Sequence, residues 1–354
     1  MGQLIVDVEK LRHNIRYLVG FCQEKNIEMA GMLKGPGFEP RIIDELRING
    51  VGTLGFGRLP LGDDVVEFSK KDAVFTSLAS LGDLERIPRV FDTSYHSQLS
   101  VIKNLNSVLT DQNISHKIVL MVDTGDLREG VLPENALSLV KKIHGIKNRK
   151  FELVGIAANL GCCAGIKPTV TNLEILQTLT QDIETMLDIR LQTISVGGSL
   201  MLEWMKNKAM PKRINQLRLG EALFLGHIPT YDIKHEELHD DVLIFKSDVL
   251  EACEKQIRLP SSRGINALGI KAKFSHGGTR KRAILNFGVS DTYPYGLTPI
   301  DERLEIINVN SNYTVVDFTN CDQDFKPGDP ITFKINYQAM LQCFISPYTF
   351  IIYR

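Results

Sequence analysis

The spacing of apolar positions changes about two thirds of the way along the chain. In the first part, short apolar runs alternate with longer stretches in which apolar residues recur at helical spacing. This alternation is typical of βα units, in which each strand of a parallel sheet is followed by a helix that covers it. We therefore expect a parallel sheet or barrel in this part.

The short apolar runs predict strands over residues 27–33, 51–54, 73–77, 118–122, 153–159, 193–196 and 217–219. Asp7 is placed to cap a first helix, Pro40 to open a second, and residues 171–187 form a long helical stretch. The series amounts to about eight βα units, which is the size of a TIM barrel. We predict a TIM-like (β/α)8 barrel over residues 1–231.

The last third of the chain has short runs of β-forming residues separated by turn signals. Strands are predicted over residues 242–250, 282–287, 304–309, 313–318 and 331–337. The pair Gly277-Gly278 and residues 327–330 (PGDP) mark turns between them. We predict an all-β domain over residues 232–354.

Composition excludes several classes of protein. The 354 residues carry a formal net charge of −1, which argues against nucleic acid or an anionic membrane as the main partner. The six cysteines form no Cys-x-x-Cys pair, so neither a metal site nor a disulfide framework is predicted. The N-terminus shows no signal peptide, and no apolar run reaches the ~18 residues of a membrane helix. We expect a cytoplasmic protein.

Lys34 is the first candidate for chemistry. It follows a predicted strand and precedes residues 35–37 (GPG), so it would lie at the C-terminal mouth of the barrel, where active sites of this fold are found. Burial lowers the pKa of a lysine and makes its amine a nucleophile for carbonyl compounds. The alternative is a strand-end lysine that only reaches water.

Two glycine-containing motifs follow the seventh and eighth strands of the predicted barrel. They are residues 195–199 (SVGGS) and 218–222 (RLGEA). Glycines let backbone N–H groups approach an anion, and TIM barrels often bind phosphate at these two strand ends. Either motif alone is more often a turn without a ligand, but together they favour a phosphorylated cofactor.

Several motifs resemble a known family. Lys34, residues 122–130 (VDTGDLREG), 159–162 (NLGC) and 215–222 (NQLRLGEA) are similar to those of the alanine/ornithine racemases, which are fold-type III pyridoxal-phosphate (PLP) enzymes. The resemblance continues to residues 346–348 (SPY) and covers almost the whole chain. It implies a racemase of free amino acids with a barrel and a β domain. It also implies a homodimer in which the β domain of one subunit closes the active site of the other.

The resemblance implies a role for each matched residue. Lys34 would carry pyridoxal 5'-phosphate as an internal aldimine, and Arg218 would face the pyridine nitrogen. The remaining cofactor-binding residues would be Arg128 at the phenolic oxygen, Ser199, Gly220 and Glu221 at the phosphate, and also Asn159 and Tyr348.

Arg218 also distinguishes between reactions. Arginine keeps its proton, so it does not convert the pyridine into a pyridinium, and the ring remains a weaker electron sink. This favours racemisation over transamination, and decarboxylases of the same fold have a carboxylate at this position. The alternatives are a PLP-dependent decarboxylase of a basic amino acid and a non-catalytic PLP-binding protein, which would be a barrel without the β domain.

The second acid/base and the substrate remain open. Tyr293, Tyr295 and Cys162 are candidates for the second base, against the alternatives of a packed loop tyrosine and a buried structural cysteine. Ornithine racemases typically show Ser-Ser-Asp-His where this chain has residues 310–313 (NSNY). Asn312 thus stands where ornithine racemases have an aspartate, whose negative charge would receive a substrate ammonium. Glu129, Asp291 or Asp317 could supply this charge instead. The substrate is predicted to be of the ornithine, alanine, serine or lysine type.

His96 follows the fourth strand position of the barrel. We interpret it as an exposed loop histidine rather than as a residue of the site.

Overall fold

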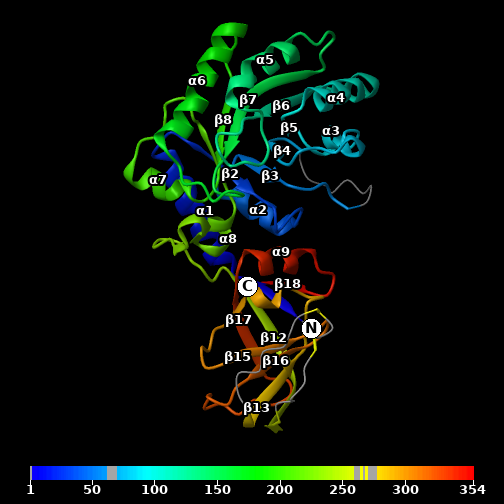
Figure 1. The fold of residues 1–354 in the computed structure, drawn as a ribbon, viewed down its shortest axis with the longest axis vertical. Helices are drawn as coiled ribbons and strands as arrows, with labels where there is room; N and C mark the ends of the chain where they lie inside the picture. The colour runs from blue at the N-terminus through cyan, green and yellow to red at the C-terminus, as the bar shows by residue number, and fades with distance from the viewer. Residues whose placement is uncertain (1, 62–69, 259–263, 266–267, 270–276) are drawn as a thin grey trace. The chain divides into compact units, whose positions relative to one another are not determined.

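Eight parallel strands close into a barrel in the computed structural model (Figure 1). The model describes residues 2–61, 70–258, 264–265, 268–269 and 277–354. The barrel strands are β2 (Glu28–Met32), β3 (Thr53–Phe56), β4 (Ala73–Phe75), β5 (Thr93–His96), β6 (His116–Met121), β7 (Phe151–Asn159), β8 (Thr193–Gly197) and β9 (Gln216–Leu219). The predicted TIM-like barrel is confirmed, and each of the seven predicted runs contains or overlaps one of these strands.

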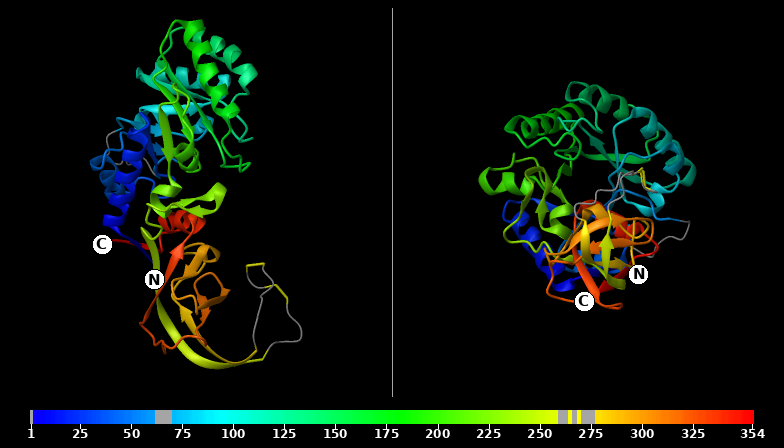
Figure 2. Two further views of the ribbon diagram at one scale, coloured as in Figure 1. Left: turned by 90° about the vertical axis from the view of Figure 1, so that its left-hand side faces the viewer. Right: turned by 60° about the horizontal axis from the view of Figure 1, so that its bottom comes forward.

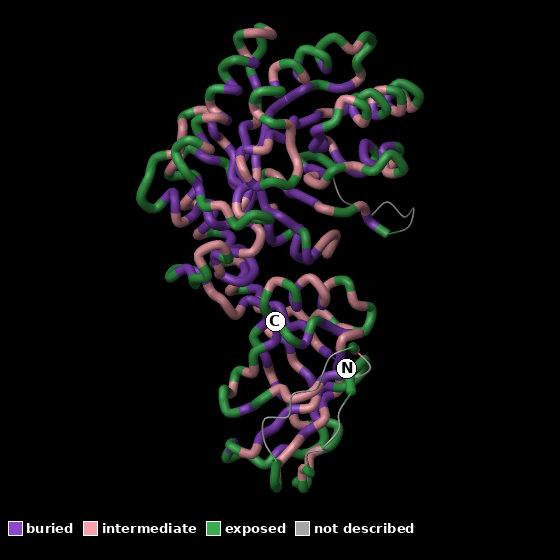
Figure 3. The backbone as a smooth tube through the Cα atoms, in the orientation of Figure 1, coloured by how far each residue is buried: buried purple, intermediate pink, exposed green. Residues whose placement is uncertain are grey.

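Helices surround the barrel strands, as the right-hand view of Figure 2 shows. They are α1 (Val8–Gln23), α2 (Pro40–Ile48), α3 (Ile87–Val90), α4 (Leu99–Gln112), α5 (Pro133–His144), α6 (Val170–Leu187), α7 (Met201–Asn207) and α8 (Glu221–Leu225). Their outward faces are exposed, whereas the strands are largely buried (Figure 3). A small hairpin of β10 (His227–Ile228) and β11 (Ile233–Lys234) follows the last barrel helix.

Local sequence signals explain where these helices begin. The Asp7 Oδ1 atom accepts a hydrogen bond from the Lys10 N–H at 3.0 Å, so the predicted cap of α1 is confirmed. Pro40 occupies the first turn of α2, where its missing N–H costs nothing. Thr169 and Asn172 form a reciprocal capping box at the start of α6.

The C-terminal part of the chain forms a mainly antiparallel sheet. Its strands are β12 (Leu243–Ile257), β13 (Gly278–Leu285), β14 (Leu297–Pro299), β15 (Glu305–Val309), β16 (Thr314–Asp317), β17 (Pro330–Ile335) and β18 (Phe350–Tyr353). The order in the sheet is β14-β17-β12-β13-β16-β15. The predicted C-terminal β domain is confirmed, and it carries one helix that the pattern did not predict, α9 (Tyr337–Ile345).

The first strand of the chain joins this C-terminal sheet. The strand β1 (Gln3–Val6) pairs antiparallel with β12 and parallel with β18. The chain accordingly divides into one compact unit of residues 12–238 and another of residues 1–11 and 239–354. The sequence-based boundary, residues 1–231 and 232–354, differs because a single four-residue strand contains no signal of its distant partners.

Each unit has its own core. Inside the barrel, the buried cluster consists of Val74, Tyr95, Val119, Met121, Val154 and Ala157. In the other unit, the rings of Phe245, Phe287 and Phe333 pack at centroid distances from 4.9 to 6.4 Å. The barrel is thus filled by side chains, and its chemistry is confined to the strand ends.

Candidate active site at the C-terminal ends of the barrel strands

Lys34 lies two residues beyond the end of β2. It belongs to a turn over residues 33–37, in which the Gly37 N–H donates a hydrogen bond to the Leu33 carbonyl at 2.9 Å. Gly37 takes a left-handed conformation with φ of 57°, which suits glycine. The lysine is exposed at the barrel mouth, yet its pKa lies below the ordinary value because surrounding protein atoms desolvate the ammonium. These features are those of an accessible amine with nucleophilic character.

Charged neighbours also act on the Lys34 ammonium. The positive charges of Arg128 and Arg218 lower its pKa further, whereas Cys162 and Glu129 act in the opposite direction. Residues from the loops after β6 and β7 and from the strand β9 itself therefore lie close enough to Lys34 to change its protonation.

Arg218 is held from three sides inside the barrel. Its Nη1 donates to the Ser195 hydroxyl at 2.7 Å, and its Nη2 donates to the Ala158 carbonyl at 2.8 Å and to Asn159 Oδ1 at 2.6 Å. The guanidinium is buried and stacks over the Tyr95 ring at 5.4 Å. Of its five N–H donors, Nε–H and one Nη1–H lie outside these three bonds.

The Ser195 hydroxyl in turn donates to Gln216 Oε1 at 2.8 Å. Neither Ser195 nor Gln216 was among the predicted site residues, although each lies inside a quoted motif. The signal that would reveal them is register: Ser195 pairs directly with Gln216, two positions before Gly197 and Arg218.

Arg128, in the loop after β6, forms a forked ion pair with Glu129. Its Nη2 donates to Glu129 Oε1 at 2.6 Å, and its Nε donates to Glu129 Oε2. Asn159, at the end of β7, donates to the same Oε1 from its Nδ2 at 2.6 Å. The structure therefore brings Arg128, Asn159 and Arg218 into one hydrogen-bonded network.

A glycine-rich turn at the end of β8 adjoins this network. A Cβ atom on Gly197 would lie 2.4 Å from Asn159 Oδ1 and 2.6 Å from Arg218 Nη2, so only glycine fits there. Gly198 has φ of 119°, which favours glycine as well. The buried Ser199 hydroxyl accepts the Ala222 N–H at 3.1 Å and thus joins the turn to α8.

Gly220 and Glu221 open α8 beside the Lys34 strand. Gly220 is the residue before the first helical turn, and a Cβ atom there would lie 3.1 Å from the Met32 Cβ. Burial raises the pKa of the Glu221 carboxyl, against the lowering effect of His227. An amine, a buried hydroxyl with its proton free to donate, a close backbone turn and a fixed guanidinium together fit a phosphorylated aldehyde such as PLP.

Cys162 is exposed in the loop after β7, so the alternative of a buried structural cysteine is wrong for this residue. Cys162 lies close enough to Lys34 and Arg128 to interact electrostatically with both. The neighbouring Cys163 N–H bonds to the buried Asp126 carboxylate at 3.0 Å, which ties this loop to the one after β6.

Tyr293 and Tyr348 belong to the other compact unit. Tyr293 precedes a short 3₁₀ turn, exposes 38% of its surface, and packs edge-on against Tyr295 at 5.8 Å. Tyr348 is exposed to 57%. All three tyrosines present surface to solvent, so their roles remain predictions.

Two of the three acids that were candidates to compensate for Asn312 have structural partners. The Asp317 carboxylate pairs with Arg280 Nε at 2.8 Å, and Asp291 accepts the Gly288 N–H at 2.9 Å. Only Glu129 belongs to the network around Lys34.

The prediction for His96 is wrong. It lies buried at the end of β5, and its Nε2 atom is 2.7 Å from the Ser94 hydroxyl, which also contacts His116 Nε2 at 2.8 Å. Burial lowers the pKa of His96 to about 4 and that of His116 to about 3. These histidines are therefore neutral at physiological pH.

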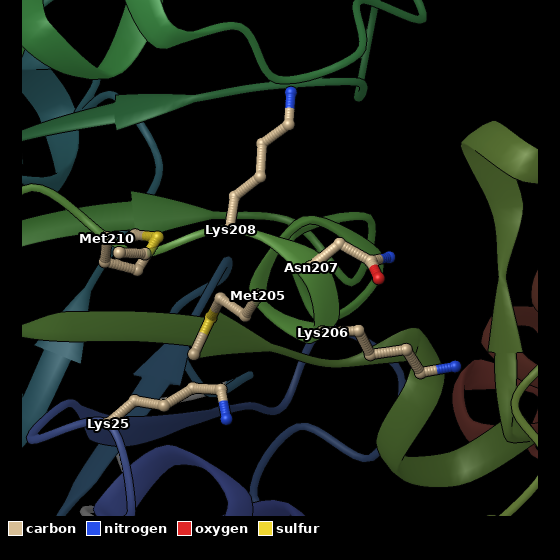
Figure 4. A pocket seen from close by; sticks show the side chains of 7 residues that line it. Lys25, Met205, Lys206, Asn207, Lys208 and Met210 are labelled. Carbon is tan, nitrogen blue, oxygen red and sulfur yellow. The ribbon is translucent and has the colours of Figure 1, made fainter.

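A recess of about 430 Å³ lies at the opposite, N-terminal end of the strands (Figure 4). It is formed by the end of α7, by residues 208–210 that follow this helix, and by Lys25 after α1, and its three lysine amines point apart. Lys25 and Lys208 each cover an aromatic ring at 4.2 Å, and Lys206 pairs with Glu203 at 3.3 Å. This arrangement is not a converging anion site.

Within the described ranges, no three His, Cys, Asp or Glu side chains gather in a way that would hold a metal ion. None of the helices in the described part of the chain combines the length and the apolarity that a membrane span requires.

Comparison with known proteins identifies the family. Residues 6–227 match the family model of the alanine racemase N-terminal domain. The chain belongs to the alanine racemase family. A lysine racemase of Thermotoga maritima is 30% identical over 355 residues, covering 99% of this chain and 98% of that protein. An ornithine racemase of Acetoanaerobium sticklandii is 30% identical over 347 residues, covering 98% of both.

The fold agrees with this membership. The alanine racemase of Bartonella henselae, solved with covalently bound pyridoxal phosphate, superposes with a TM-score of 0.70 at 15% identity and covers 100% of this chain and 99% of that one. The predicted family is confirmed, and with it the prediction of an amino-acid racemase.

Proposed function

We propose that the protein is a PLP-dependent racemase that interconverts the L- and D-forms of a free amino acid, with Lys34 as the residue that binds the cofactor. The observation that carries this proposal is the convergence of Lys34, Arg218 and Ser199 at one end of the barrel. PLP would supply an electron-withdrawing ring that acidifies the Cα proton of the amino acid once the amino group has taken the place of Lys34 on the cofactor.

The residues of the chain have separate tasks in this proposal. Arg218 would hold the pyridine nitrogen through a donor that never loses its proton, which limits electron withdrawal. Ser199 and the backbone at Gly220 and Glu221 would hold the phosphate. Lys34 Nζ would exchange the Cα proton on one face of the substrate, and Arg128 would approach the phenolic oxygen.

A second proton-exchanging group is required on the other face of the substrate. We propose Tyr293 of the partner subunit in a homodimer with shared active sites, with Cys162 as the competing candidate. Exposure of Tyr293 is consistent with contact to a second subunit. Cys162 is favoured by its position near Lys34. The rates at which the Tyr293→Phe and Cys162→Ser variants exchange the substrate Cα proton distinguish the two candidates.

The proposed substrates are free amino acids with a basic side chain, lysine and ornithine. Both full-length relatives are named for such substrates, each at 30% identity. Asn312 is exposed in the loop between β15 and β16 and brings no charge. Of the three acids that were candidates to supply the missing charge, Glu129 is the one that belongs to the network around Lys34. We place the reaction in the cytoplasm, because all six cysteines are free.

The experiment is visible absorption of purified protein followed by chiral chromatography with L-lysine, L-ornithine, L-alanine and L-serine. We expect a band of bound PLP that is absent in Lys34→Ala, and the D-isomer from at least one basic substrate. A band without turnover of any of the four would favour a PLP-binding protein. Release of CO2 would favour a decarboxylase, and absence of a band after addition of PLP would overturn the proposal.

A further inference from the structure

Glu129 joins the two arginines of the site. Its Oε1 atom accepts hydrogen bonds from Arg128 Nη2 and from Asn159 Nδ2, each at 2.6 Å. Asn159 Oδ1 then accepts from Arg218 Nη2, also at 2.6 Å. These four side chains form a continuous chain from the loop after β6 to the end of β9.

Asn159 has a fixed orientation because of Glu129. An amide side chain has one accepting and one donating end, and a carboxylate accepts only. Because Asn159 Nδ2 faces Glu129, Asn159 Oδ1 faces Arg218 and accepts the hydrogen bond that the guanidinium donates. The amide is therefore held from both ends, and a neutral side chain at position 129 would remove one of these two constraints and leave only the Arg218 donor.

Arg128 depends on Glu129 more directly. The Arg128 side chain is 37% exposed, whereas the Glu129 side chain is 11% exposed, so the carboxylate is the better fixed partner. A forked pair fixes the plane of a guanidinium as well as its position. The second acid near Arg128, Asp126, is 3.9 Å from its Nε and does not replace this pairing.

We propose that Glu129 is a positioning residue that orients Arg128 directly and Arg218 through Asn159. This inference rests on the proposed function, in which both arginines face the cofactor. Among the described residues whose charges act on Lys34, Glu129 provides the carboxylate, which raises the pKa of the ammonium against two arginines.

The test uses Glu129→Gln, which keeps size and removes charge, and Glu129→Asp, which keeps charge and shortens the reach. Glu134→Gln, on the exposed first turn of α5, is the matched control. The measurements are the PLP affinity of the cofactor-free protein, the pH dependence of the bound-PLP absorption, kcat and KM.

We expect Glu129→Gln to lower kcat by about 10- to 100-fold, the usual cost of losing a group that orients a ligand-contacting residue. The pH midpoint of the absorption change should fall, because a negative charge near Lys34 is lost. Glu129→Asp should restore part of both effects, and Glu134→Gln should behave as the wild type.

A double-substitution cycle isolates the route through Arg128. The part of the Glu129→Gln effect on kcat that passes through Arg128 should vanish in an Arg128→Lys background, and the part that remains measures the route through Asn159 and Arg218. Unchanged kcat and pH midpoint in Glu129→Gln, with the wild type binding PLP, would overturn this inference alone. A wild type that binds no PLP would overturn the proposed function, and the inference with it.

Discussion

At the scale of single residues, Gly197 limits what the site can accommodate. Its φ is not in the left-handed region, so the demand for glycine is steric: the Asn159 and Arg218 side chains occupy the space of a Cβ atom. We expect Gly197→Ala to separate this pair, to lower the free energy of unfolding by about 1–3 kcal/mol, and to reduce racemisation. Denaturant unfolding measures the loss of stability, and turnover measures the loss of racemisation.

Gly20→Ala on α1 is the control, because nothing lies within 4 Å of a Cβ atom there. It should raise the free energy of unfolding by about 0.5–1 kcal/mol, as alanine does in a helix. Equal behaviour of the two variants would contradict the steric explanation.

The buried histidines predict a pH dependence of stability. The pKa of His96 falls from 6.5 in the unfolded chain to about 4 in the fold, so unfolding takes up a proton below pH 6.5. Stability is complete above pH 6.5 and declines as pH falls toward 4, by roughly 3 kcal/mol from His96. Urea unfolding at a series of pH values measures this decline.

His116→Gln should reduce the slope, because His116 also has a lowered pKa and must be protonated on unfolding. His144→Gln, at an exposed position on α5, is the control for the effect of replacing one histidine by glutamine on the slope. A slope that stays the same in His116→Gln would show that other groups cause the acid sensitivity.

Residue types alone indicated Lys34, Arg218 and Ser199, because each lies within a motif at a strand end. The burial of His96 was not predictable in the same way. The sequence is the same whether a histidine at the end of a strand points to solvent or lies beneath a helix. Only the packing of β5 against its neighbours determines whether His96 is buried.

At the scale of elements, the capping box of α6 is both a helix start and a tether. The Thr169 Oγ1 atom accepts the Asn172 N–H at 3.1 Å, and Asn172 Nδ2 donates to the Thr124 carbonyl in the loop after β6 at 2.5 Å. Thr169→Ala should therefore lower the free energy of unfolding by about 1 kcal/mol.

The matched variant is Thr110→Ala on α4, where an exposed hydroxyl bonds to the Asn106 carbonyl one turn back. Its effect should stay within about 0.5 kcal/mol, the range for surface positions away from caps. Thermal or urea unfolding of both proteins checks the difference, and equal losses would count against the cap.

Periodicity predicted the long elements well. The helix expected over residues 171–187 spans Val170–Leu187, and the strand expected over residues 153–159 spans Phe151–Asn159. The helix α9 was missed because Tyr337, Phe344 and Ile345 are also strand formers, and because it follows β17 with only one residue between them, so the predicted strand over residues 331–337 ran into it.

At the scale of the whole molecule, the proposed sharing of active sites between two subunits predicts complementation. Lys34→Ala and Tyr293→Phe should each be inactive as homodimers. If Tyr293 serves Lys34 of the partner subunit, random mixing by reversible dissociation should restore about a quarter of wild-type activity, because half of the dimers carry one intact site of two.

Size measurement of the wild type comes first, since the experiment requires a dimer. A mixture that stays inactive while subunits exchange would contradict the role of Tyr293. In that case Cys162→Ser becomes the decisive variant.

The sequence by itself determined the barrel, the β domain, the family and the motifs that meet at the strand ends. The barrel and the β domain follow from local patterns: period-two and period-3.6 spacing, capping residues, and glycines where the backbone must turn. The family follows from the resemblance of motifs such as residues 122–130 and 215–222. Tertiary structure alone decided the pairing of β1 with β12 and β18, the burial of His96, and the chain from Arg128 through Glu129 and Asn159 to Arg218. These contacts join residues far apart in sequence, and their geometry depends on strand register and packing, which no single segment encodes.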